Sequence, residues 1–141
     1  MLHKRFLSLA PAILAVMATI VAGTAPAAAS QHDLPGDESK GVLILTISEG
    51  ERARPDAAGA VLTCEPAGGT HPLSEAACAE LAAVNGEVAA VELEPQRPCY
   101  LIYRPLTVTA HGSWDGRPIS YRETFPNDCV LDVIKGPIFR F

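Results

Sequence analysis

The chain has 141 residues, with 16 acidic and 11 basic side chains and a formal net charge of −5. This balance argues against a nucleic-acid-binding protein, because phosphates require a basic face. A chain of this length accommodates one domain with a modest hydrophobic core.

The N-terminal segment has the pattern of a secretory signal peptide. A basic start, His3-Lys4-Arg5, precedes an apolar run from Phe6 to Ala22, and Ala27-Ala28-Ala29 then fits the A-x-A cleavage pattern. We therefore predict a signal peptide over residues 1–29 and a secreted, extracellular protein without membrane association after cleavage. A transmembrane anchor is the alternative, but the apolar run is short and lacks a basic stop. Cleavage leaves 112 residues with a net charge of −7, since all acidic residues remain.

The first part of the exported chain is predicted to form an arm and two strands. Residues 30–40 are polar and indicate a flexible N-terminal arm, followed by a single domain over residues 41–141. The run from Val42 to Ile47 predicts a strand that is apolar on both faces. We expect the domain's own core to cover one face, and a helix or a partner subunit to cover the other. Ala60 to Cys64 is predicted as the return strand.

A helix is predicted after the Gly-Gly-Thr-His-Pro break at residues 68–72. Ser74 is expected to cap its first backbone N–H groups, and Asn85-Gly86 is expected to end it. Apolar residues recur at helical spacing between these limits. They place Cys78 on the buried face, which suits a disulfide to the strand that carries Cys64.

Asp115-Gly116 predicts a two-residue hairpin turn. The turn sets the register of the two strands, so that Leu106 lies across from Phe125. One face of this hairpin is apolar except for Glu123. The other face is polar and carries Thr107, Thr109, His111, Ser120, Arg122 and Thr124.

The C-terminal segment is predicted to contain two short elements. Val130 to Ile134 indicates a short helix, and Ile138 to Phe141 indicates a final strand.

Four cysteines in an exported chain of this size are typical of two disulfides. They are Cys64, Cys78, Cys99 and Cys129. A zinc site is the alternative, but no C-x-x-C pair is present and the histidines are scattered. Of the three possible pairings we predict Cys64–Cys78 with Cys99–Cys129, which closes one short loop and one of about thirty residues.

The sequence favours neither an enzyme nor a protein with a cofactor or metal. No serine lies in a G-x-S-x-G elbow, no G-x-x-x-x-G-K phosphate loop is present, and the cysteines are expected to be oxidised. Three histidines follow the signal peptide: His32 in the arm, His71 in a turn and His111 on the hairpin. No nucleophile, base and orienting group occur together, so we predict no catalytic residues.

Two interpretations fit the segment from Arg97 to Pro105. Its centre, Tyr100-Leu101-Ile102-Tyr103, has strong strand propensity and favours a buried strand. The prolines at both ends and the disulfide expected at Cys99 favour instead a stiffened loop that presents large apolar side chains to a binding partner.

Short motifs follow one another in a fixed order along the exported chain. They are Leu45-Thr46-Ile47, Leu62-Thr63-Cys64, Gly69-Thr70-His71-Pro72, Ala77 to Val84, Cys99 with Tyr103 and Pro105, Leu106 to Thr109, Trp114, Ser120-Tyr121, Asn127-Asp128-Cys129 and Phe139-Arg140-Phe141. With the four cysteines, this ordered set resembles the Streptomyces subtilisin inhibitor family from about Val42 to Phe141. The resemblance implies an α+β fold, in which a five-stranded antiparallel sheet packs with two helices and carries two disulfides. It further implies a homodimer and inhibition of secreted, subtilisin-like serine endopeptidases.

The resemblance also assigns residues to roles. It places the reactive bond between Leu101 and Ile102, with Leu101 as the P1 residue that fills the protease's specificity pocket. The remaining assignments are Cys99, Tyr100, Tyr103, Arg104 and Pro105 to the reactive loop, Asn127 to support behind the loop, and Ile44 to the centre of the dimer interface. On the residues alone, Asn127 fits equally well as a turn residue after Pro126.

The chain departs from the family pattern at three places. Tyr100 stands where proline is usual, Arg104 replaces a residue that is commonly acidic, and the turn from Cys64 to His71 is one residue shorter.

We therefore predict a secreted inhibitor of subtilisin-like serine proteases, with chymotrypsin-like enzymes as further targets. Leucine at P1 suits a large apolar pocket and suits trypsin poorly, because trypsin's pocket binds a cation. The alternative is a non-inhibitory secreted binding module on the same scaffold. A third hypothesis is inhibition of a trypsin-like or metallo-enzyme through a shifted register that uses Arg97 or Arg104.

Overall fold

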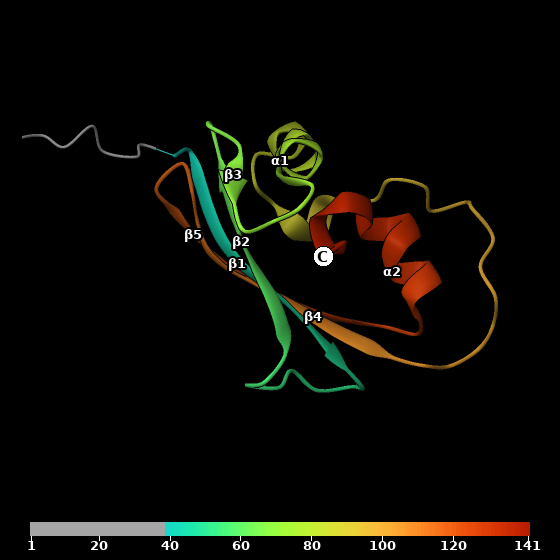
Figure 1. Cartoon of the computed structure of the whole chain (residues 1–141). Helices are drawn as coiled ribbons and strands as arrows, with labels where there is room; N and C mark the ends of the chain where they lie inside the picture. The colour runs from blue at the N-terminus through green and yellow to red at the C-terminus, as the bar shows by residue number, and fades with distance from the viewer. Residues whose placement is uncertain (1–38) are drawn as a thin grey trace, which may run out of the picture. The chain divides into compact units, whose positions relative to one another are not determined.

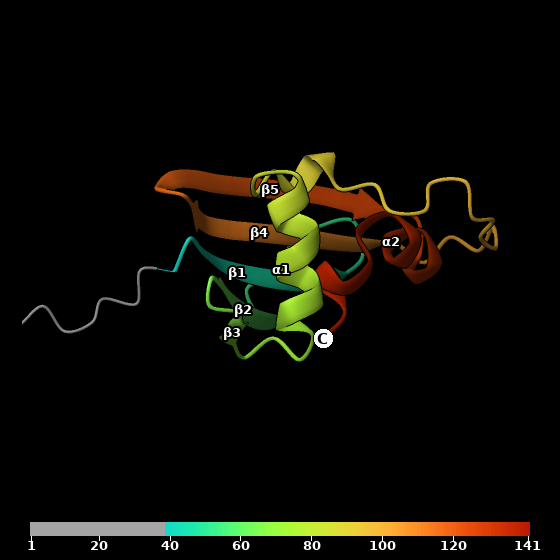
Figure 2. The ribbon, with the colours of Figure 1, turned by 90° about the horizontal axis from the view of Figure 1, so that it is seen from above.

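The computed structural model describes residues 39–141, and the predicted signal peptide and nearly all of the predicted arm lie outside the described residues. One antiparallel sheet of five strands, in the order β3-β2-β1-β4-β5, carries the helices on one face (Figures 1 and 2). The strands are β1 Gly41–Glu49, β2 Ala58–Cys64, β3 Gly68–Gly69, β4 Leu106–Trp114 and β5 Arg117–Phe125. The α-helices are α1 Ser74–Ala83 and α2 Asp128–Lys135, and the 3₁₀ turns are η1 Val88–Ala90 and η2 Gly136–Phe139. The predicted fold class is confirmed.

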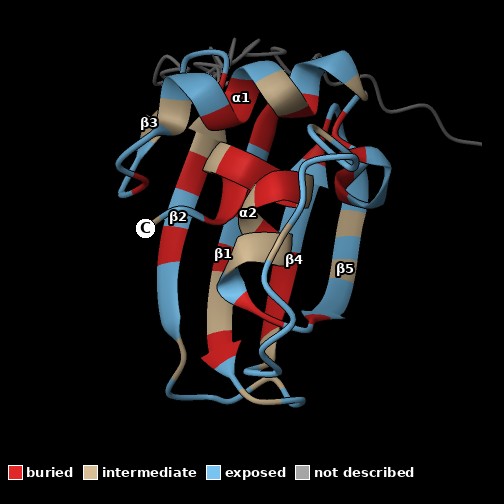
Figure 3. Ribbon diagram, turned by 90° about the vertical axis from the view of Figure 1, so that its right-hand side faces the viewer, coloured by how far each residue is buried: buried red, intermediate tan, exposed pale blue. Residues whose placement is uncertain are grey.

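The core lies between the sheet and the helices, and Figure 3 shows the buried residues gathered there. Alternation along β1 turns Leu43 and Leu45 inward, where Leu62 of β2 and Val108 of β4 lie beside them; all four are at most 1% exposed. Leu81 of α1 closes the core from above. Over residues 39–141, none of the helices has the length and apolarity that crossing a bilayer requires.

The hairpin has the predicted turn and register. Asp115 and Gly116 both have positive φ, +50° and +71°, as a type I′ turn requires. Leu106 pairs with Phe125 across the strands, as expected. The polar face of the hairpin is not wholly exposed to solvent, because Thr107 and Thr109 are buried.

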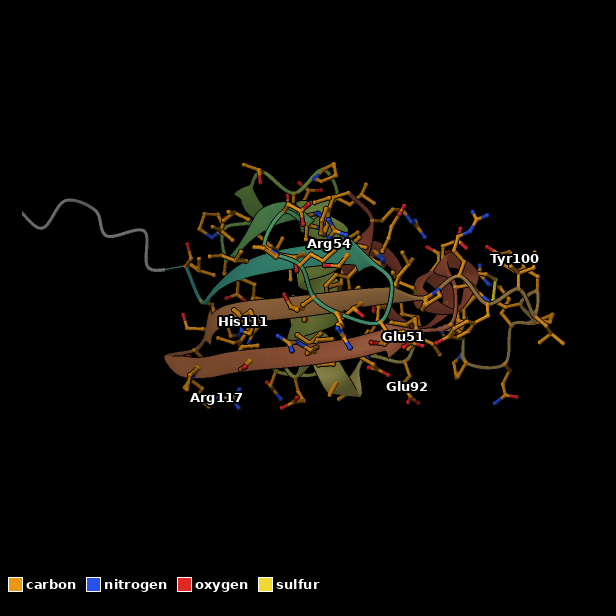
Figure 4. All side chains as sticks on the ribbon, turned by 90° about the horizontal axis from the view of Figure 1, so that it is seen from below. Glu51, Arg54, Glu92, Tyr100, His111 and Arg117 are labelled. Carbon is orange, nitrogen blue, oxygen red and sulfur yellow. A yellow bond between two sulfur atoms is a disulfide. The ribbon has the colours of Figure 1, made fainter. Side chains whose placement is uncertain are left out.

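Thr107 is buried because the β1–β2 connection folds over this end of the sheet, on the side away from the helices (Figure 4). The Thr107 hydroxyl donates to Gly50 O at 2.8 Å. Further along β4, the Thr109 hydroxyl lies 2.7 Å from that of Thr46 on β1. Polar side chains on this face therefore pair with one another.

The predicted start of the first helix was wrong in detail. Ser74 is the first helical residue and not the cap; Leu73 holds the cap position and makes no side-chain cap bond. The side chain of His71 accepts a backbone N–H at the helix start instead, because its Nδ1 accepts from Leu73 N at 3.0 Å. Since Nδ1 is an acceptor, the proton lies on Nε2, which donates to Ile138 O at 3.0 Å. His71 thus joins the helix start to the C-terminal segment.

The predicted C-terminal helix is confirmed and extends over Asp128–Lys135, but the predicted final strand is wrong. Gly136–Phe139 forms a 3₁₀ turn, with Pro137 in its first turn. Ile138 and Phe139 are neighbours in the chain and are both buried, at 0% and 5% exposed. A strand directs consecutive side chains to opposite faces, so it could not place both in the same core.

The two disulfides have the predicted pairing. Cys64–Cys78 links β2 to α1, and Cys99–Cys129 links the segment before β4 to the first turn of α2. The first bridge therefore fastens the sheet to a helix, whereas the second fastens a long connection to the body.

A buried lysine holds the η1 turn against α2. Lys135 is 1% exposed, and its ammonium donates to Val88 O, Ala89 O and Val91 O at 2.9, 3.1 and 2.9 Å. Burial lowers the pKa of this ammonium, while the Glu123 carboxylate, 3.9 Å away, acts in the opposite direction. The contacts fix the chain shortly before the segment that the sequence singled out.

Candidate functional site

The segment from Pro95 to Pro105 is an irregular connection that projects beyond the end of the sheet between η1 and β4 (Figure 2). The buried-strand interpretation is therefore wrong. Leu101 is fully exposed, at 100%, and Ile102 is 63% exposed. Large apolar side chains held in solvent cost solubility and are typical of a binding surface.

Four consecutive residues, Pro126 to Cys129, hold this loop from behind. Cys129 makes the disulfide to Cys99, and Pro126 O accepts from Arg104 N at 2.8 Å. These two bonds lie on either side of Leu101 and Ile102. The start of α2 and the residues just before it thus form one support for the whole loop.

Asn127 bonds to the backbone on both sides of the Leu101–Ile102 peptide. Its side-chain amide donates to Tyr100 O at 3.1 Å and to Ile102 O at 3.0 Å. Its Oδ1 accepts from Val130 N at 2.9 Å, which caps α2. The side chain is 2% exposed and uses donors and acceptor together. The sequence allowed two roles for Asn127, a turn residue or a support for the loop. Its side chain makes the bonds of both.

Two tyrosines of the loop bond to carboxylates of the body. The Tyr100 hydroxyl donates to Asp128 of α2, and the Tyr103 hydroxyl donates to Glu51 of the β1–β2 connection. The hydrogen bond to Asp128 raises the pKa of Tyr100, and the same bond lowers the pKa of Asp128. Glu51 likewise raises the pKa of Tyr103. Neither carboxylate was predicted from the sequence as a partner of the loop.

The β1–β2 connection also touches the end of the loop directly. Gly50 N donates to Pro105 O at 2.7 Å, and Gly50 O accepts from the Thr107 hydroxyl. Glu51 follows Gly50, so its carboxylate extends from a backbone that is already fixed to the start of β4. Figure 4 shows Glu51 on this connection and Tyr100 further out on the loop.

Beyond the bonds to the start of α2, an apolar pocket of about 350 Å³ lies between the loop and the helix, lined among others by Cys99, Ile102, Val130 and Ile134. Side chains do not fill the space between loop and helix. The loop is therefore positioned by the disulfide and by individual hydrogen bonds more than by close packing.

The histidines considered in the sequence are not grouped around a common centre. His71 is buried between Leu73 and Ile138, His111 is exposed on β4, and His32 lies outside the described residues. Over residues 39–141 no cluster of three or more His, Cys, Asp or Glu side chains is arranged to bind a metal ion.

A small disulfide-bonded α+β domain with an outward-facing loop, braced on both sides of one peptide bond, belongs to the class of scaffolds that present a rigid peptide to a partner. Residues 39–127 match the family described as "Subtilisin inhibitor-like", and the chain belongs to this family.

Relatives and a solved structure agree with this membership. The chain is 48% identical over 102 residues to "Subtilisin inhibitor-like protein 5" of Streptomyces fradiae, a match that covers 70% of this chain and 95% of that protein. It is 38% identical over 135 residues to "Subtilisin inhibitor" of Streptomyces violaceus, with 91% of each covered. Its fold resembles that of Streptomyces caespitosus sermetstatin, solved in complex with Bacillus licheniformis subtilisin. The TM-score is 0.60 at 31% identity, over 72% of this chain and 98% of the other.

Proposed function

We propose that this chain is a secreted inhibitor of subtilisin-like serine proteases, with Leu101–Ile102 as the reactive bond. The observation that carries the proposal is a fully exposed Leu101 whose flanking carbonyls are both bonded to the buried Asn127. The names of the relatives support the same activity. The signal-peptide pattern over residues 1–29 supports secretion.

The loop geometry accounts for inhibition in place of rapid cleavage. A serine protease binds an extended segment whose P1 side chain fills its specificity pocket, and Leu101 is free to enter a large apolar pocket. Because the loop is ordered before binding, little conformational entropy is lost on association. If the bond is cut, Cys99–Cys129 and the Asn127 bonds keep both new ends in place. The peptide bond then re-forms more readily than the acyl-enzyme hydrolyses.

The shifted-register hypothesis is disfavoured by the residues that follow each arginine. Arg97 precedes Pro98 and Arg104 precedes Pro105, so either arginine at P1 would place proline directly after the scissile bond. Arg97 is also paired with Asp132 and Glu94, each at 2.9 Å. These pairs hold its guanidinium against the body of the domain.

Titration of active-site-counted proteases tests the proposed function. The purified exported chain should inhibit subtilisin tightly and stoichiometrically, chymotrypsin to a lesser extent, and trypsin poorly. A non-inhibitory binding module would leave all three enzymes active. Preferential inhibition of trypsin, or of a zinc metalloprotease included in the panel, would support the shifted register and overturn the assignment of Leu101.

Asn127 gives a prediction that separates loop support from helix capping. Asn127→Asp keeps the acceptor for Val130 N but removes both donors to the loop, whereas Asn127→Ala removes all three bonds. We expect both variants to be cleaved at Leu101–Ile102 roughly thirtyfold faster by subtilisin, since two hydrogen bonds at about 1 kcal/mol each are lost. The alanine variant should lose about 1 kcal/mol of stability through the missing cap. The aspartate variant keeps the cap, but its buried carboxylate faces the Tyr100 and Ile102 carbonyls, so any loss of stability there has a different cause.

The lifetime of the inhibitor with subtilisin, followed by mass spectrometry, measures the first effect, and chemical unfolding measures the second. Equal lifetimes for Asn127→Asp and the parent chain would show that Asn127 does not support the loop and acts only in the turn before α2.

We further propose that the chain forms a homodimer through the sheet face away from the helices. Val42, Ile44 and Val61 on that face are 38%, 56% and 37% exposed. In the sheet register Ile44 lies between Val61 and His111, at the centre of this apolar patch. Within residues 39–141 the patch has no helix over it, which leaves it available to a second copy of the chain.

Ile44→Asp should therefore convert the dimer to monomers, because a carboxylate at the centre of an apolar contact loses its hydration. Ala76→Asp, which adds the same charge on the exposed side of α1, is the matched control and should stay dimeric. Light scattering on the parent and both variants gives the masses. A monomer mass for the parent chain would refute the dimer, whereas inhibition by a monomeric Ile44→Asp would show that the loop acts independently of it.

A further inference from the structure

We propose that Tyr100 and Tyr103 are positioning residues of the reactive loop, each fixing the backbone beside the reactive bond by donating its hydroxyl to a carboxylate of the body. The inference rests on the proposed function, in which the loop persists as an uncleaved or re-formed peptide. It assigns a role to two side chains next to the reactive bond and to two carboxylates, Asp128 and Glu51, that lie outside the loop.

The four side chains around the reactive bond divide into two kinds. Those of Leu101 and Ile102 extend into solvent with no hydrogen-bonding group. Those of Tyr100 and Tyr103 are 48% and 64% exposed, yet both end in a bond to the body. The outer pair of the four residues is therefore anchored, while the inner pair remains free for a protease.

Each carboxylate that receives a tyrosine is itself held in place. Asp128 is the first residue of α2, between the capping Asn127 and the disulfide-bonded Cys129. The guanidinium of Arg104 lowers the pKa of Asp128, in addition to the larger effect of the Tyr100 bond, and thus favours the charged acceptor. A charged acceptor makes the stronger hydrogen bond.

The second carboxylate, Glu51, follows Gly50, whose backbone is bonded to Pro105 O and to the Thr107 hydroxyl. The tyrosines therefore connect the loop to two different elements, α2 on the Tyr100 side and the β1–β2 connection on the Tyr103 side. Opposite sides of the reactive bond are thereby fixed independently of each other.

The loop requires such anchors because little else restricts it. An apolar pocket lies between part of the loop and α2, so close packing defines little of its path. Tyr100 also leaves its own φ angle free, whereas proline at this position would fix it. The hydrogen bond from the Tyr100 hydroxyl to Asp128, at the start of α2, restricts the backbone at Tyr100 in place of a proline ring.

The test compares Tyr100→Phe and Tyr103→Phe with the matched control Tyr121→Phe. Tyr121 also donates its hydroxyl to a carboxylate, that of Glu123, but both residues lie on β5 away from the loop. All three changes remove one oxygen and keep the ring. The readouts are the initial inhibition constant for subtilisin, the rate of cleavage at Leu101–Ile102, and amide hydrogen exchange over residues 99–105 in the free protein.

We expect each loop variant to be cleaved roughly fivefold faster than the parent, and the double variant roughly thirtyfold faster, as loss of about 1 kcal/mol per bond implies. Amide exchange in the loop should accelerate in parallel. Tyr121→Phe should leave cleavage and loop exchange unchanged. Cleavage of Tyr100→Phe and Tyr103→Phe at the parent's rate would overturn the inference.

A double-mutant cycle distinguishes positioning from general loosening of the fold. Tyr100→Phe should have no further effect in an Asp128→Ala background, because the bond is already absent, whereas independent, multiplicative effects would contradict the pairing.

If the parent chain does not inhibit subtilisin, the proposed function fails. Hydrogen exchange in the free protein still decides whether the tyrosines fix the loop.

Discussion

Leu101→Lys is expected to turn this chain into an inhibitor of trypsin, with a gain of at least about 100-fold toward that enzyme. The physical reason is that trypsin's specificity pocket has an aspartate at its base, so a lysine side chain gains a buried ion pair that leucine cannot offer. Inhibition of subtilisin should weaken because the ammonium fits an apolar pocket poorly. It should not vanish, since the methylene stem still covers apolar surface.

Ile102→Lys is the matched control, because it places the same charge one residue further along the loop, at a side chain that is also exposed. Inhibition constants for both variants against trypsin and subtilisin provide the measurement. If Ile102→Lys gains trypsin inhibition and Leu101→Lys does not, the reactive bond lies between Ile102 and Tyr103. If neither variant changes the profile, this loop does not enter the specificity pocket at all.

Removal of the Cys99–Cys129 bridge is expected to convert the inhibitor into a substrate. In Cys99→Ser/Cys129→Ser, the new end at Leu101 is no longer covalently tied to α2 once the bond is cut. Hydrolysis of the acyl-enzyme then competes successfully with re-formation of the peptide. We expect cleavage at least about 100-fold faster, because a covalent constraint and the positions of the hydrogen-bonded groups that depend on it are lost together.

Cys64→Ser/Cys78→Ser is the control that separates this effect from stability. Its bridge spans 14 residues against 30 for the other. The chain-entropy relation then gives losses of about 3 kcal/mol for the first and about 3.6 kcal/mol for the second, so both variants are destabilised to a similar degree. At a temperature where both are folded, the control should remain a persistent inhibitor. Comparable cleavage of the two variants would show that the bridge acts through global stability alone.

The sheet was predictable wherever short local patterns set the pairing. Asp115-Gly116 fixed the hairpin register, because a two-residue turn permits only one alignment of its strands. The C-terminal strand was mispredicted because Ile138 and Phe139 have strand propensity. In the structure both pack into the same core cluster as Leu81, which a strand does not allow for consecutive residues. Burial of Thr107 also depended on a tertiary event, the folding of residues 50–57 over the sheet.

The candidate site was predictable only in part. Strand propensity could not tell whether Tyr100 to Tyr103 lay in the core or in solvent, and the reactive bond is predicted there from the family resemblance alone. The cysteine pairing followed from the sequence and is confirmed. The tyrosine–carboxylate bonds did not follow, because Glu51 lies 52 residues before Tyr103 and Asp128 lies 28 residues after Tyr100. Acidic side chains at such distances have no periodicity that would mark them as partners.

The buried position of Lys135 has a practical consequence for chemical labelling of this domain. Residues 39–141 contain two lysines, and three backbone carbonyls enclose the amine of Lys135. Amine-reactive dyes or resins will therefore couple within this range at Lys40, whose side chain is 37% exposed. Lys40 precedes β1 and bonds to Asp115, at the far end of β4 from the reactive loop. Conjugation at Lys40 leaves the loop directed away from the attachment surface.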